Sequence, residues 1–380
     1  MSSKLTALAK TLAREAGFAA VGIARAGEVD PAAAERFRLW VRSGLAGPLD
    51  YLRRHEALRR DARLLVPGAR SVICLAATYP DSDHPQGTNG PSEQLCEEAS
   101  RPACRRPSRD SQSQQQTTNN EQQTTNTVFS LSGLIARYAA GRDYHKTLTS
   151  RCRPLMDRLR QEMPGFDGRA FVDSGPVMER TWAVQAGLGW IGRNGCLTVP
   201  GLGSYVLLCE IFCNLDLLPD PPLPGGCDQC DRCVRACPTG ALRADGLVDC
   251  RLCISCLTIE QEEAVEAALW PRMQDRLFGC DACQEACPHN PARSAPAPVR
   301  DLLEVLGWDD AQWDRATRGR ALRRASLEMF LRNAAIACGN AAASVAPPLR
   351  PVVRAALEKL AQAHPSLAGP AEWALRRLGG

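Results

Sequence analysis

The segment that decides the fold is Cys227-Asp-Gln-Cys-Asp-Arg-Cys-Val-Arg-Ala-Cys-Pro238. Two residues separate each of its first three cysteines, and the fourth cysteine follows three residues later, directly before a proline. A shorter run, Cys280-Asp-Ala-Cys-Gln-Glu-Ala-Cys-Pro288, repeats the second half of this pattern. Three thiolates at this spacing wrap one face of a [4Fe–4S] cluster, while the cysteine before the proline reaches a second cluster. The two runs therefore predict two clusters that exchange their fourth ligands.

This exchange predicts a ligand set for each cluster. The first cluster is expected to bind Cys227, Cys230, Cys233 and Cys287. The second is expected to bind Cys237, Cys280, Cys283 and one further cysteine from the loop between the runs. Three cysteines lie in that loop, and spacing alone does not choose among Cys250, Cys253 and Cys256.

Zinc is the alternative explanation of paired Cys-x2-Cys motifs. A zinc site needs only four ligands, so the third cysteine of the first run and the two Cys-Pro endings favour iron–sulfur clusters. Cys96 and Cys104 lie in a polar tract and are poor ligand candidates. Six further thiols lie in strand or helix patterns and are expected to be small buried hydrophobic groups. These are Cys74, Cys152, Cys196, Cys209, Cys213 and Cys338.

The composition is ordinary for a soluble globular protein apart from its 18 cysteines in 380 residues. The formal charge of +4 is too small to mark the whole chain as a nucleic-acid binder, so any basic surface must be local. The N-terminus shows no apolar core of a secretory signal, and no apolar run approaches about 18 residues. We therefore expect a cytoplasmic protein without membrane contact, whose reduced thiols are available as metal ligands.

Helical and extended patterns alternate in the part of the chain that precedes the cysteines. Helical patterns occupy 31–43 and 145–163, and a leucine repeat predicts another helix before Gly17. Apolar strands are expected at 18–24, 71–79, 169–173 and 205–213. The alternation favours a layered α/β architecture, and the expected fold class is α+β or α/β.

Two proline-rich segments predict the domain boundaries. Leu218-Pro-Asp-Pro-Pro-Leu-Pro-Gly-Gly226 is a strong breaker, and 291–298 is a second linker. A Gln-rich tract at 80–127 buries too little apolar surface to fold, so it is expected to be a disordered insertion. The expected domains are an α/β domain at 1–218, a ferredoxin-like domain at 219–295 and a helical tail at 296–380.

Outside the cysteines, few motifs carry chemistry. Gly187-Leu-Gly-Trp-Ile-Gly192 matches G-x-G-x-x-G but follows a helix instead of a strand, so we do not expect a dinucleotide site. Asp173 ends a predicted strand, where α/β sheets open on clefts, and is a catalytic candidate; an Asx-turn is its structural alternative. Basic side chains at the start of the tail suit either a solvated helix face or phosphate contacts. These are Arg315, Arg318, Arg320, Arg323, Arg324 and Arg332.

Several segments resemble epoxyqueuosine reductases, the family that performs the last step of queuosine synthesis in tRNA. They are Tyr138-Ala-Ala-Gly-Arg-Asp-Tyr-His-Lys146, Val172-Asp-Ser-Gly-Pro-Val-Met-Glu-Arg180, Ala186-Gly-Leu-Gly-Trp-Ile-Gly-Arg-Asn194 and Cys253-Ile-Ser-Cys-Leu-Thr-Ile-Glu260. The segment Leu331-Arg-Asn-Ala-Ala-Ile-Ala-Cys-Gly-Asn340 resembles the helical, HEAT-like extension of that family. The similar motifs recur in the same order over nearly the whole chain except 80–127.

The resemblance implies a cobalamin held by the first domain, two [4Fe–4S] clusters in the second, and a tRNA substrate contacted by the HEAT-like tail. It implies removal of the epoxide oxygen from the modified wobble base by reduced cobalamin. The clusters would relay the two electrons from an external one-electron donor of the flavodoxin or ferredoxin type. In such a reaction the cofactor supplies the reducing chemistry, and the protein supplies binding and orientation.

The resemblance also implies roles for particular residues. It gives Cys253 as the missing ligand of the second cluster, whereas Cys256 stands where the family usually has tyrosine. It places Asp173 in the position of the proton donor, with Tyr144 and His145 beside the substrate pocket. The cobalamin contacts that it implies are Arg59, Ala136, Asp173, Asn194, Leu197, Ser255, Thr258 and Glu260.

Three other functions remain open at this stage. A reductive dehalogenase uses the same pair of cofactors, but such enzymes usually carry a twin-arginine export signal, and the basic tail suits a tRNA enzyme better. A ferredoxin-type electron carrier would bind no corrinoid. A zinc-based nucleic-acid binder would lack the brown colour of iron–sulfur clusters.

Overall fold

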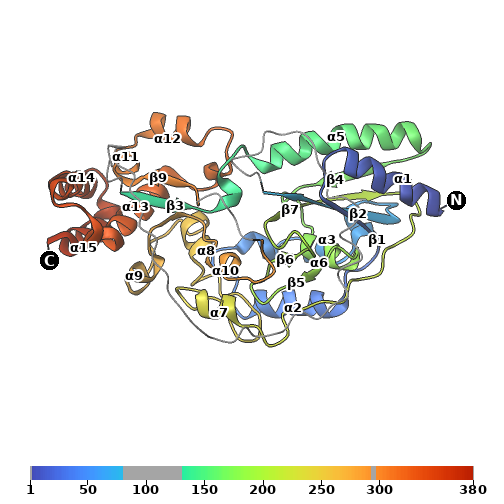
Figure 1. Cartoon of the computed structure of the whole chain (residues 1–380), viewed down its shortest axis with the longest axis horizontal. Helices are drawn as coiled ribbons and strands as arrows, with labels where there is room; N and C mark the ends of the chain where they lie inside the picture. The colour runs from blue at the N-terminus through green and yellow to red at the C-terminus, as the bar shows by residue number, and fades with distance from the viewer. Residues whose placement is uncertain (1, 80–130, 292–296, 380) are drawn as a thin grey trace, which may run out of the picture.

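The computed structural model describes residues 2–79, 131–291 and 297–379. The chain is elongated, with its N-terminus at one end and its C-terminus at the other (Figure 1). A sheet covered by helices forms the N-terminal end, helices form the C-terminal end, and the cysteine-rich segment lies between them (Figure 1). The insertion predicted at 80–127 lies outside the described residues.

A four-stranded sheet in the order β1-β2-β7-β4 forms the centre of the N-terminal part. Its strands are β1 (Ala20–Arg25), β2 (Ser71–Thr78), β7 (Val206–Cys213) and β4 (Gly168–Phe171). Every pairing in this sheet is antiparallel. Parallel neighbours would need long crossover connections, which an α/β domain supplies with helices. This part is therefore α+β, and the expectation of an α/β domain is wrong.

Alternating side chains give the sheet two apolar faces. Ile73 and Ile211 point to one face, against α1 and α5. Val72 and Phe212 point to the other face, against α6. The covering helices are α1 (Ser2–Glu15), α5 (Tyr144–Glu162) and α6 (Glu179–Gln185). Because both faces are covered, a charged side chain on a central strand has no direct route to water.

Short elements complete the N-terminal part and carry several of the expected site residues. Asp30 caps the helix α2, because its side chain accepts a hydrogen bond from the Ala33 amide. The elements are α2 (Pro31–Arg42), η1 (Asp50–Arg53), α3 (Glu56–Arg60), α4 (Ala62–Leu65), η3 (Arg137–Ala139), β5 (Trp190–Ile191) and β6 (Leu197–Thr198).

A small sheet joins the three expected domains. Its strand order is β8-β3-β9, with β3 parallel to β8 and antiparallel to β9. The strands are β3 (Ser132–Ile135), β8 (Arg276–Phe278) and β9 (Val299–Asp301), one from each expected domain. The apolar cluster beside it likewise contains Ile135, Phe278 and Phe330. The division at 218 and 295 stays a prediction, but these segments share one core.

The cysteine-rich segment contains only short elements, because the chain repeatedly turns to bring thiols together. They are α7 (Arg232–Ala236), α8 (Ile254–Ile259), η4 (Ala267–Leu269), α9 (Trp270–Met273) and α10 (Ala282–Glu285). Helices α7 and α10, one from each cysteine run, lie against each other.

Packed helices form the tail. Helix α13 (Leu327–Ala341) is its centre and is buried along most of its length. A Cβ atom at Gly339 would lie 2.3 Å from the Trp373 ring, so glycine permits the close approach of α15. The other elements are α11 (Leu302–Leu306), α12 (Asp310–Thr317), η5 (Ala321–Arg324), η6 (Ala342–Ser344), η7 (Pro347–Leu349), α14 (Arg350–Ala363), η8 (Pro365–Leu367) and α15 (Ala368–Gly379).

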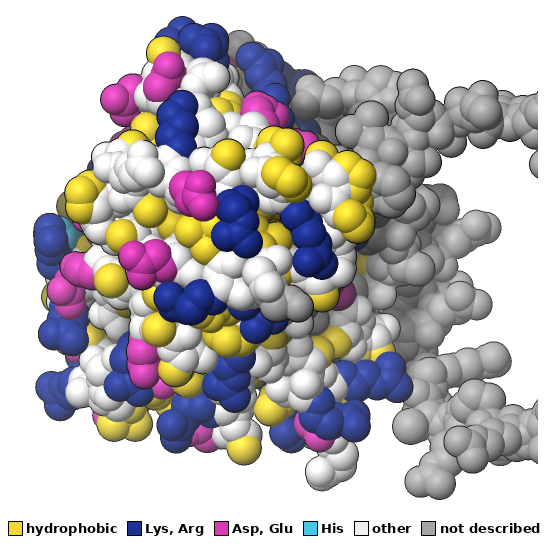
Figure 2. Space-filling model, turned by 90° about the vertical axis from the view of Figure 1, so that its left-hand side faces the viewer, with side chains coloured by type: hydrophobic (Ala, Val, Ile, Leu, Met, Phe, Trp, Pro, Cys, Tyr) yellow, Lys and Arg dark blue, Asp and Glu magenta, His cyan; other side chains and the backbone are white. Residues whose placement is uncertain are grey.

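Figure 2 shows the face at the tail end, where basic side chains are scattered among apolar and acidic ones. Of the helices within the described ranges, none has both the length and the apolar character that crossing a bilayer requires.

Candidate functional site

The cysteines expected to hold the first cluster lie together. Burial raises the pKa of the Cys233 thiol, and repulsion from Cys227, Cys287 and Cys230 raises it further. Cys287 comes from the second cysteine run, so the fold brings the two runs to one place. Thiolates crowded in a region of low dielectric require compensating positive charge, which iron supplies.

The cysteines expected for the second cluster form another group. Burial raises the pKa of Cys253 to about 12, with added repulsion from Cys280. Burial also raises the pKa of Cys280 and Cys283, the former with repulsion from Cys237 and the latter with repulsion from Cys253. The loop cysteine implied by the family resemblance is therefore the one that lies with this group. The ligand sets stay predictions that the grouping supports.

Two cysteines of the loop pair with each other. A hydrogen bond between their thiols lowers the pKa of Cys250 and raises that of Cys256. Both are buried, as expected for small apolar groups. Within the described residues, no group of three or more His, Cys, Asp or Glu side chains is arranged to hold a single metal ion.

The glycine-rich loop lies against the first cysteine group. The Arg193 amide donates a hydrogen bond to the Cys227 sulfur over 3.3 Å. A Cβ atom at Gly189 would lie 1.9 Å from the carbonyl oxygen of Thr198, so this glycine allows the β5–β6 hairpin to close. The loop follows α6, as the sequence indicated, and lies against the cysteine segment.

One thiol expected to be a buried hydrophobic group has a different setting. Cys196 is half-buried. Its charge raises the pKa of Cys283, and the charge of Cys287 raises the pKa of Cys196, so the three thiols lie close together. The expectation of complete burial is wrong for this residue. The other five such thiols are buried, as expected: Cys74, Cys152, Cys209, Cys213 and Cys338.

The expected proton donor lies in a strained turn. Asp173 follows β4 and has φ 47, in the left-handed region that non-glycine residues rarely occupy. Its amide donates to Glu179 Oε1 over 2.6 Å, which holds the turn against the first residue of α6. The carboxyl group is 59% exposed. The sheet is antiparallel, so the parallel-sheet rule that singled out this residue does not apply; the turn places it.

A phenol and an imidazole contact this carboxyl group. The Tyr144 hydroxyl donates a hydrogen bond to Asp173 Oδ2, and His145 Nε2 lies 3.8 Å from the same oxygen. His145 Nδ1 lies 2.8 Å from Asp143 Oδ1, so a proton on Nδ1 would donate to this acceptor. The Asp143 side chain also accepts the His145 amide and so begins α5. The three residues expected at the substrate pocket are thus brought together.

Polar groups from three segments lie close to this arrangement. Arg324 from η5 makes two hydrogen bonds to Glu260, which follows α8, and lies 5.7 Å from the Tyr51 ring. Burial raises the pKa of Tyr51, and the charges of Glu260 and Asp173 raise it further. Helix α8 has six residues and is about 9 Å long, so it connects Cys253 at its start with Glu260 at its end.

The expected cobalamin contacts are partly buried polar groups. Arg59 is 8% exposed and Asn194 is 8% exposed. Arg59 Nε and Asn194 Nδ2 are buried without a hydrogen-bond partner among the described residues. Ala136, Leu197 and Thr258 are buried, while Ser255 and Glu260 are partly exposed. Buried donors rarely stay unpaired in proteins, so these two point to an acceptor on a bound group.

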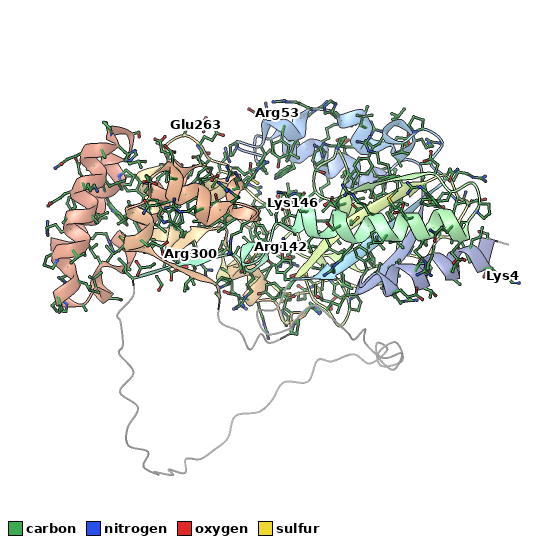
Figure 3. The ribbon with its side chains drawn as sticks, turned by 90° about the horizontal axis from the view of Figure 1, so that it is seen from above. Lys4, Arg53, Arg142, Lys146, Glu263 and Arg300 are labelled. Carbon is green, nitrogen blue, oxygen red and sulfur yellow. The ribbon has the colours of Figure 1, made fainter. Side chains whose placement is uncertain are left out.

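Figure 3 shows Arg142 and Lys146 near the start of α5, between the sheet and the tail.

At the start of the tail, most of the expected basic groups have partners. Arg318 and Arg323 pair with Asp314. Arg332 is 3% exposed and donates to backbone carbonyls, so it is no phosphate contact.

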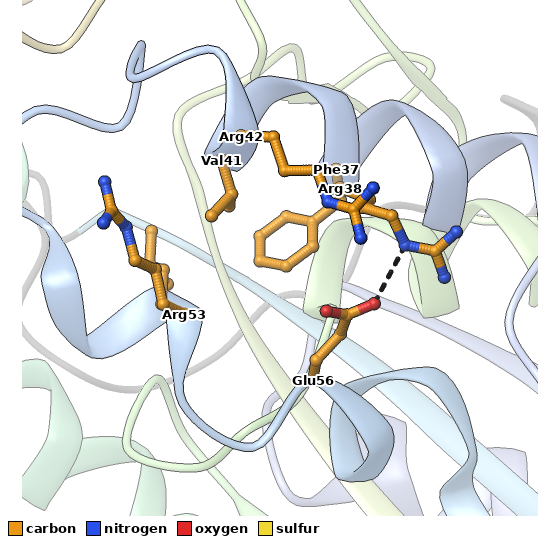
Figure 4. A pocket seen from close by; sticks show the side chains of 7 residues that line it. Phe37, Arg38, Val41, Arg42, Arg53 and Glu56 are labelled. Carbon is orange, nitrogen blue, oxygen red and sulfur yellow. Dashed lines mark hydrogen bonds and ion pairs between the residues drawn. The ribbon is translucent and has the colours of Figure 1, made fainter.

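A pocket of about 260 Å³ lies between α2 and η1 (Figure 4). Its Arg38 pairs with Glu35 and Glu56, as the dashed line to Glu56 shows (Figure 4). This volume is below that of typical cofactor sites. The pocket is therefore too small for a large ligand.

Sequence reasoning missed two acidic residues near Asp173. Glu179 begins α6, and Glu210 lies on β7 with 0% exposure. The signal for Glu210 was present, because a carboxyl group interrupts the apolar strand Val206–Cys213.

Sheet, helical tail and paired cysteine groups define an iron–sulfur protein with a mixed helix and sheet fold. Residues 226–290 match the family model of the 4Fe-4S double cluster binding domain, and 109–174 match that of "Epoxyqueuosine reductase QueG, DUF1730". An epoxyqueuosine reductase of Gloeobacter violaceus is 35% identical over 352 residues, covering 89% of this chain and 97% of the relative. One of Burkholderia pseudomallei is 34% identical, covering 98% and 92%. The chain belongs to the epoxyqueuosine reductase family.

Solved structures support the fold. An epoxyqueuosine reductase from Streptococcus thermophilus superposes with a TM-score of 0.77 at 24% identity, covering 100% of this chain and 90% of the other. An epoxyqueuosine reductase with an epoxyqueuosine-modified tRNA-Tyr stem loop gives 0.74 at 23% identity, covering 99% of both chains.

Proposed function

We propose that the protein reduces epoxyqueuosine at the wobble position of tRNA to queuosine. The observation that carries this proposal is the path along α8 in a member of this family. It runs from Cys253, in the second cysteine group, to Glu260, which pairs with Arg324 close to Asp173. The reaction consumes two electrons and two protons and releases the epoxide oxygen as water. The site must therefore deliver both electrons and protons to one bound base.

Electron delivery is the role of the cysteine groups. The first cluster would be held by Cys227, Cys230, Cys233 and Cys287, and the second by Cys237, Cys253, Cys280 and Cys283. The second cluster would lie at the start of α8, because Cys253 precedes this helix, and Glu260 follows its end. A hydrogen bond from the Arg193 amide stabilises the negative charge on Cys227. Single electrons would enter from an external donor of the flavodoxin or ferredoxin type.

A corrinoid fits the donors near Asp173. The amide side chains of a corrinoid offer acceptors for Arg59 Nε and Asn194 Nδ2. Both atoms are otherwise buried and unpaired among the described residues. When bound, cobalamin would supply a strongly reducing cobalt centre for the epoxide carbon. The remaining expected contacts, Ala136, Leu197, Ser255, Thr258 and Glu260, would shape and line its site. Arg324 orients Glu260 through two hydrogen bonds.

Asp173 would donate a proton to the departing oxygen. Burial and the Asp173 charge raise the pKa of Tyr144, so this phenol stays protonated and keeps its hydrogen bond to the carboxyl group. His145, held by Asp143, approaches the same oxygen and limits its orientation. These contacts fix where the proton is released.

The tRNA would reach this site from the side of α5 and the tail. The solved reductase that holds a modified tRNA stem loop shares the fold of this chain. Arg142 and Lys146 directly flank the Asp143–Tyr144–His145 segment at the start of α5 and would meet the anticodon phosphates. Such contacts make affinity fall with salt.

The test begins with anaerobic reconstitution, followed by counting iron and cobalt per chain and assaying tRNA that lacks the final reduction. We expect two clusters, one corrinoid and formation of queuosine. Asp173→Ala should retain both cofactors and lose about 10²–10⁴ of the turnover rate. Asp157→Ala, which removes an exposed carboxyl group of α5, is the matched control and should remain active.

Three results would contradict the proposal. Full activity of Asp173→Ala would exclude the acid role. Clusters without affinity for any corrinoid would favour an electron carrier. Reduction of an organohalide, with no turnover of the tRNA, would favour the dehalogenase alternative.

A further inference from the structure

Exposed positive charge gathers on α2 and on the segment that follows it. The segment Tyr51-Leu-Arg-Arg-His-Glu-Ala-Leu-Arg-Arg60 carries four arginines, and of these only Arg59 has a role in the proposed function. Arg53 pairs with Asp50 at 3.5 Å, but both side chains are more than half exposed, so this weak pair leaves the guanidinium accessible. Three further arginines are exposed and have no acidic partner among the described residues: Arg42, Arg54 and Arg60.

An apolar pocket opens between these arginines. It is the pocket of about 260 Å³ between α2 and η1. Phe37 and Val41, four residues apart on α2, and Leu52 on η1 form its apolar lining. Figure 4 shows the Phe37 ring in the middle of the pocket, with Arg53 on one side and Arg42 on the other. Aromatic stacking and phosphate contacts from arginines are the means by which proteins hold unpaired nucleotides.

The acidic side chain that lines the pocket is already paired. Arg38 donates to Glu56 Oε1 over 3.0 Å and to Glu35 Oε2 over 2.7 Å. Glu56 Oε2 accepts no hydrogen bond within the described ranges, so it is open to an N–H group on the edge of a base. Because three arginines and one glutamate line the pocket, the lining is positive overall.

The pocket adjoins the active site through η1. Tyr51 precedes Leu52 in this short helix, and its ring lies 5.7 Å from the Arg324 guanidinium, which makes two hydrogen bonds to Glu260. Asp173 lies close enough for its charge to act on both Tyr51 and Arg324. The Tyr51 side chain is 43% exposed. Successive residues of η1 therefore reach the active site and the pocket.

We propose that this pocket binds a nucleobase of the tRNA next to the modified nucleotide, with the base against Phe37 and its phosphates on Arg42 and Arg53. The inference rests on the proposed function, because it adds a second binding site for the same substrate. Bases in single-stranded loops are unstacked and can be splayed out onto aromatic side chains. Since the two nucleotides share a backbone, holding one in the pocket limits where the other lies beside Asp173.

The first test measures RNA binding without turnover. The probe is a fluorescein-labelled, unmodified anticodon stem–loop RNA, titrated with the cluster-loaded protein by anisotropy at several salt concentrations. Each phosphate contact in single-stranded RNA contributes about 0.7 to the slope of log affinity against log salt, so a variant with both Arg42→Gln and Arg53→Gln should lose about 1.4 of this slope. The matched control is Arg14→Gln, because Arg14 is likewise an exposed arginine in the last turn of its helix. It should keep the affinity and the slope of the wild type.

Substitutions of the aromatic ring separate stacking from charge. Phe37→Leu keeps an apolar side chain but removes the aromatic face, so it should weaken binding about tenfold. Phe37→Tyr keeps the aromatic face and should retain the affinity. The melting temperature and the iron content, measured for every variant, show whether a loss of affinity comes from unfolding.

A crosslink locates the base. RNA that carries 4-thiouridine directly before or directly after the wobble position is irradiated on the protein, and the crosslinked peptide is identified by mass spectrometry. From one of the two positions we expect an adduct on the pocket lining, at Phe37, Val41 or Leu52. Crosslinks that form only outside the pocket would overturn the proposal.

The outcomes separate this proposal from the proposed function. An unchanged salt slope in the double arginine variant, or an unchanged affinity of Phe37→Leu, would overturn the nucleotide site even if the enzyme forms queuosine. A wild type that gives the expected crosslink and variant effects but leaves the epoxide intact would overturn the proposed function and not the nucleotide site.

Discussion

Replacing Arg332 by methionine should destabilise the junction between the tail and the cysteine-rich segment. Arg332 is 3% exposed on α13, and its guanidinium donates to three backbone carbonyls. Nη1 reaches Gln261 over 2.6 Å and Glu263 over 2.8 Å, and Nη2 reaches Leu257 over 2.7 Å. Methionine fills a similar volume but leaves all three acceptors without this donor.

The magnitude follows from two opposing effects. Each hydrogen bond from a charged donor contributes about 1.5–3 kcal/mol, so three contribute roughly 4.5–9 kcal/mol. Burial lowers the pKa of Arg332 from 12.5 to about 10, which corresponds to a cost of about 3 kcal/mol for keeping the charge inside. The substitution removes both, so we expect a net loss of about 3 kcal/mol. At about 2–4 °C per kcal/mol, the melting temperature should fall by roughly 6–12 °C.

The assay is thermal unfolding of the anaerobically purified holoenzyme, followed by circular dichroism, together with the rate of iron loss to a chelator. The carbonyls belong to the segment that follows Cys253, so the second cluster should lose iron faster than the first. Arg354→Met, which changes an exposed arginine of α14, is the control and should leave both measurements unchanged. An Arg332→Met midpoint within about 1 °C of the wild type would refute the reasoning, because the carbonyls would then be satisfied without the guanidinium.

Three further predictions test the site and the sheet. Cys253→Ser should lose the second cluster while Cys256→Ser keeps both, and equal iron and sulfide counts in the two variants would contradict the ligand set. Because burial raises the pKa of Glu179 to about 8, its folded carboxyl group binds a proton that the unfolded chain releases near pH 4.5, so stability should fall by up to about 1.4 kcal/mol per pH unit between these values. Glu179→Gln should flatten this dependence in denaturant titrations, and an unchanged slope would count against the raised pKa. Gly22→Ala should cost about 1–3 kcal/mol, because its Cβ would lie 2.0 Å from the Ala186 carbonyl oxygen; a wild-type denaturation midpoint would show that α6 moves aside.

Local patterns were sufficient for the cysteine segment and for most elements. The helix expected at 145–163 is α5 (Tyr144–Glu162), and the strand expected at 205–213 is β7 (Val206–Cys213). Periodicity reveals such elements because it records which side chains face the core. The ligand sets came from spacing and resemblance, and they stay predictions.

The sequence did not predict the direction of the strands in the large sheet. The alternation of helices and strands favoured a parallel arrangement, but every pairing in the large sheet is antiparallel. The pattern of buried residues in a strand that is covered on both faces is the same in either direction, so it does not distinguish them. The small sheet also joins three segments that linker composition had separated.

The sequence by itself determined the iron–sulfur chemistry, because cluster ligation depends on thiols held a few residues apart in a short loop. It also determined the family, through motifs that recur in order. Only the tertiary structure decided which acidic side chains are buried and which of them meet. A strained turn holds the Asp173 amide against Glu179 at the start of α6, and Glu210 is 0% exposed on a central strand. Burial raises the pKa of Glu179 and of Glu210. Burial arises when distant segments pack against each other, so no local stretch of sequence records it.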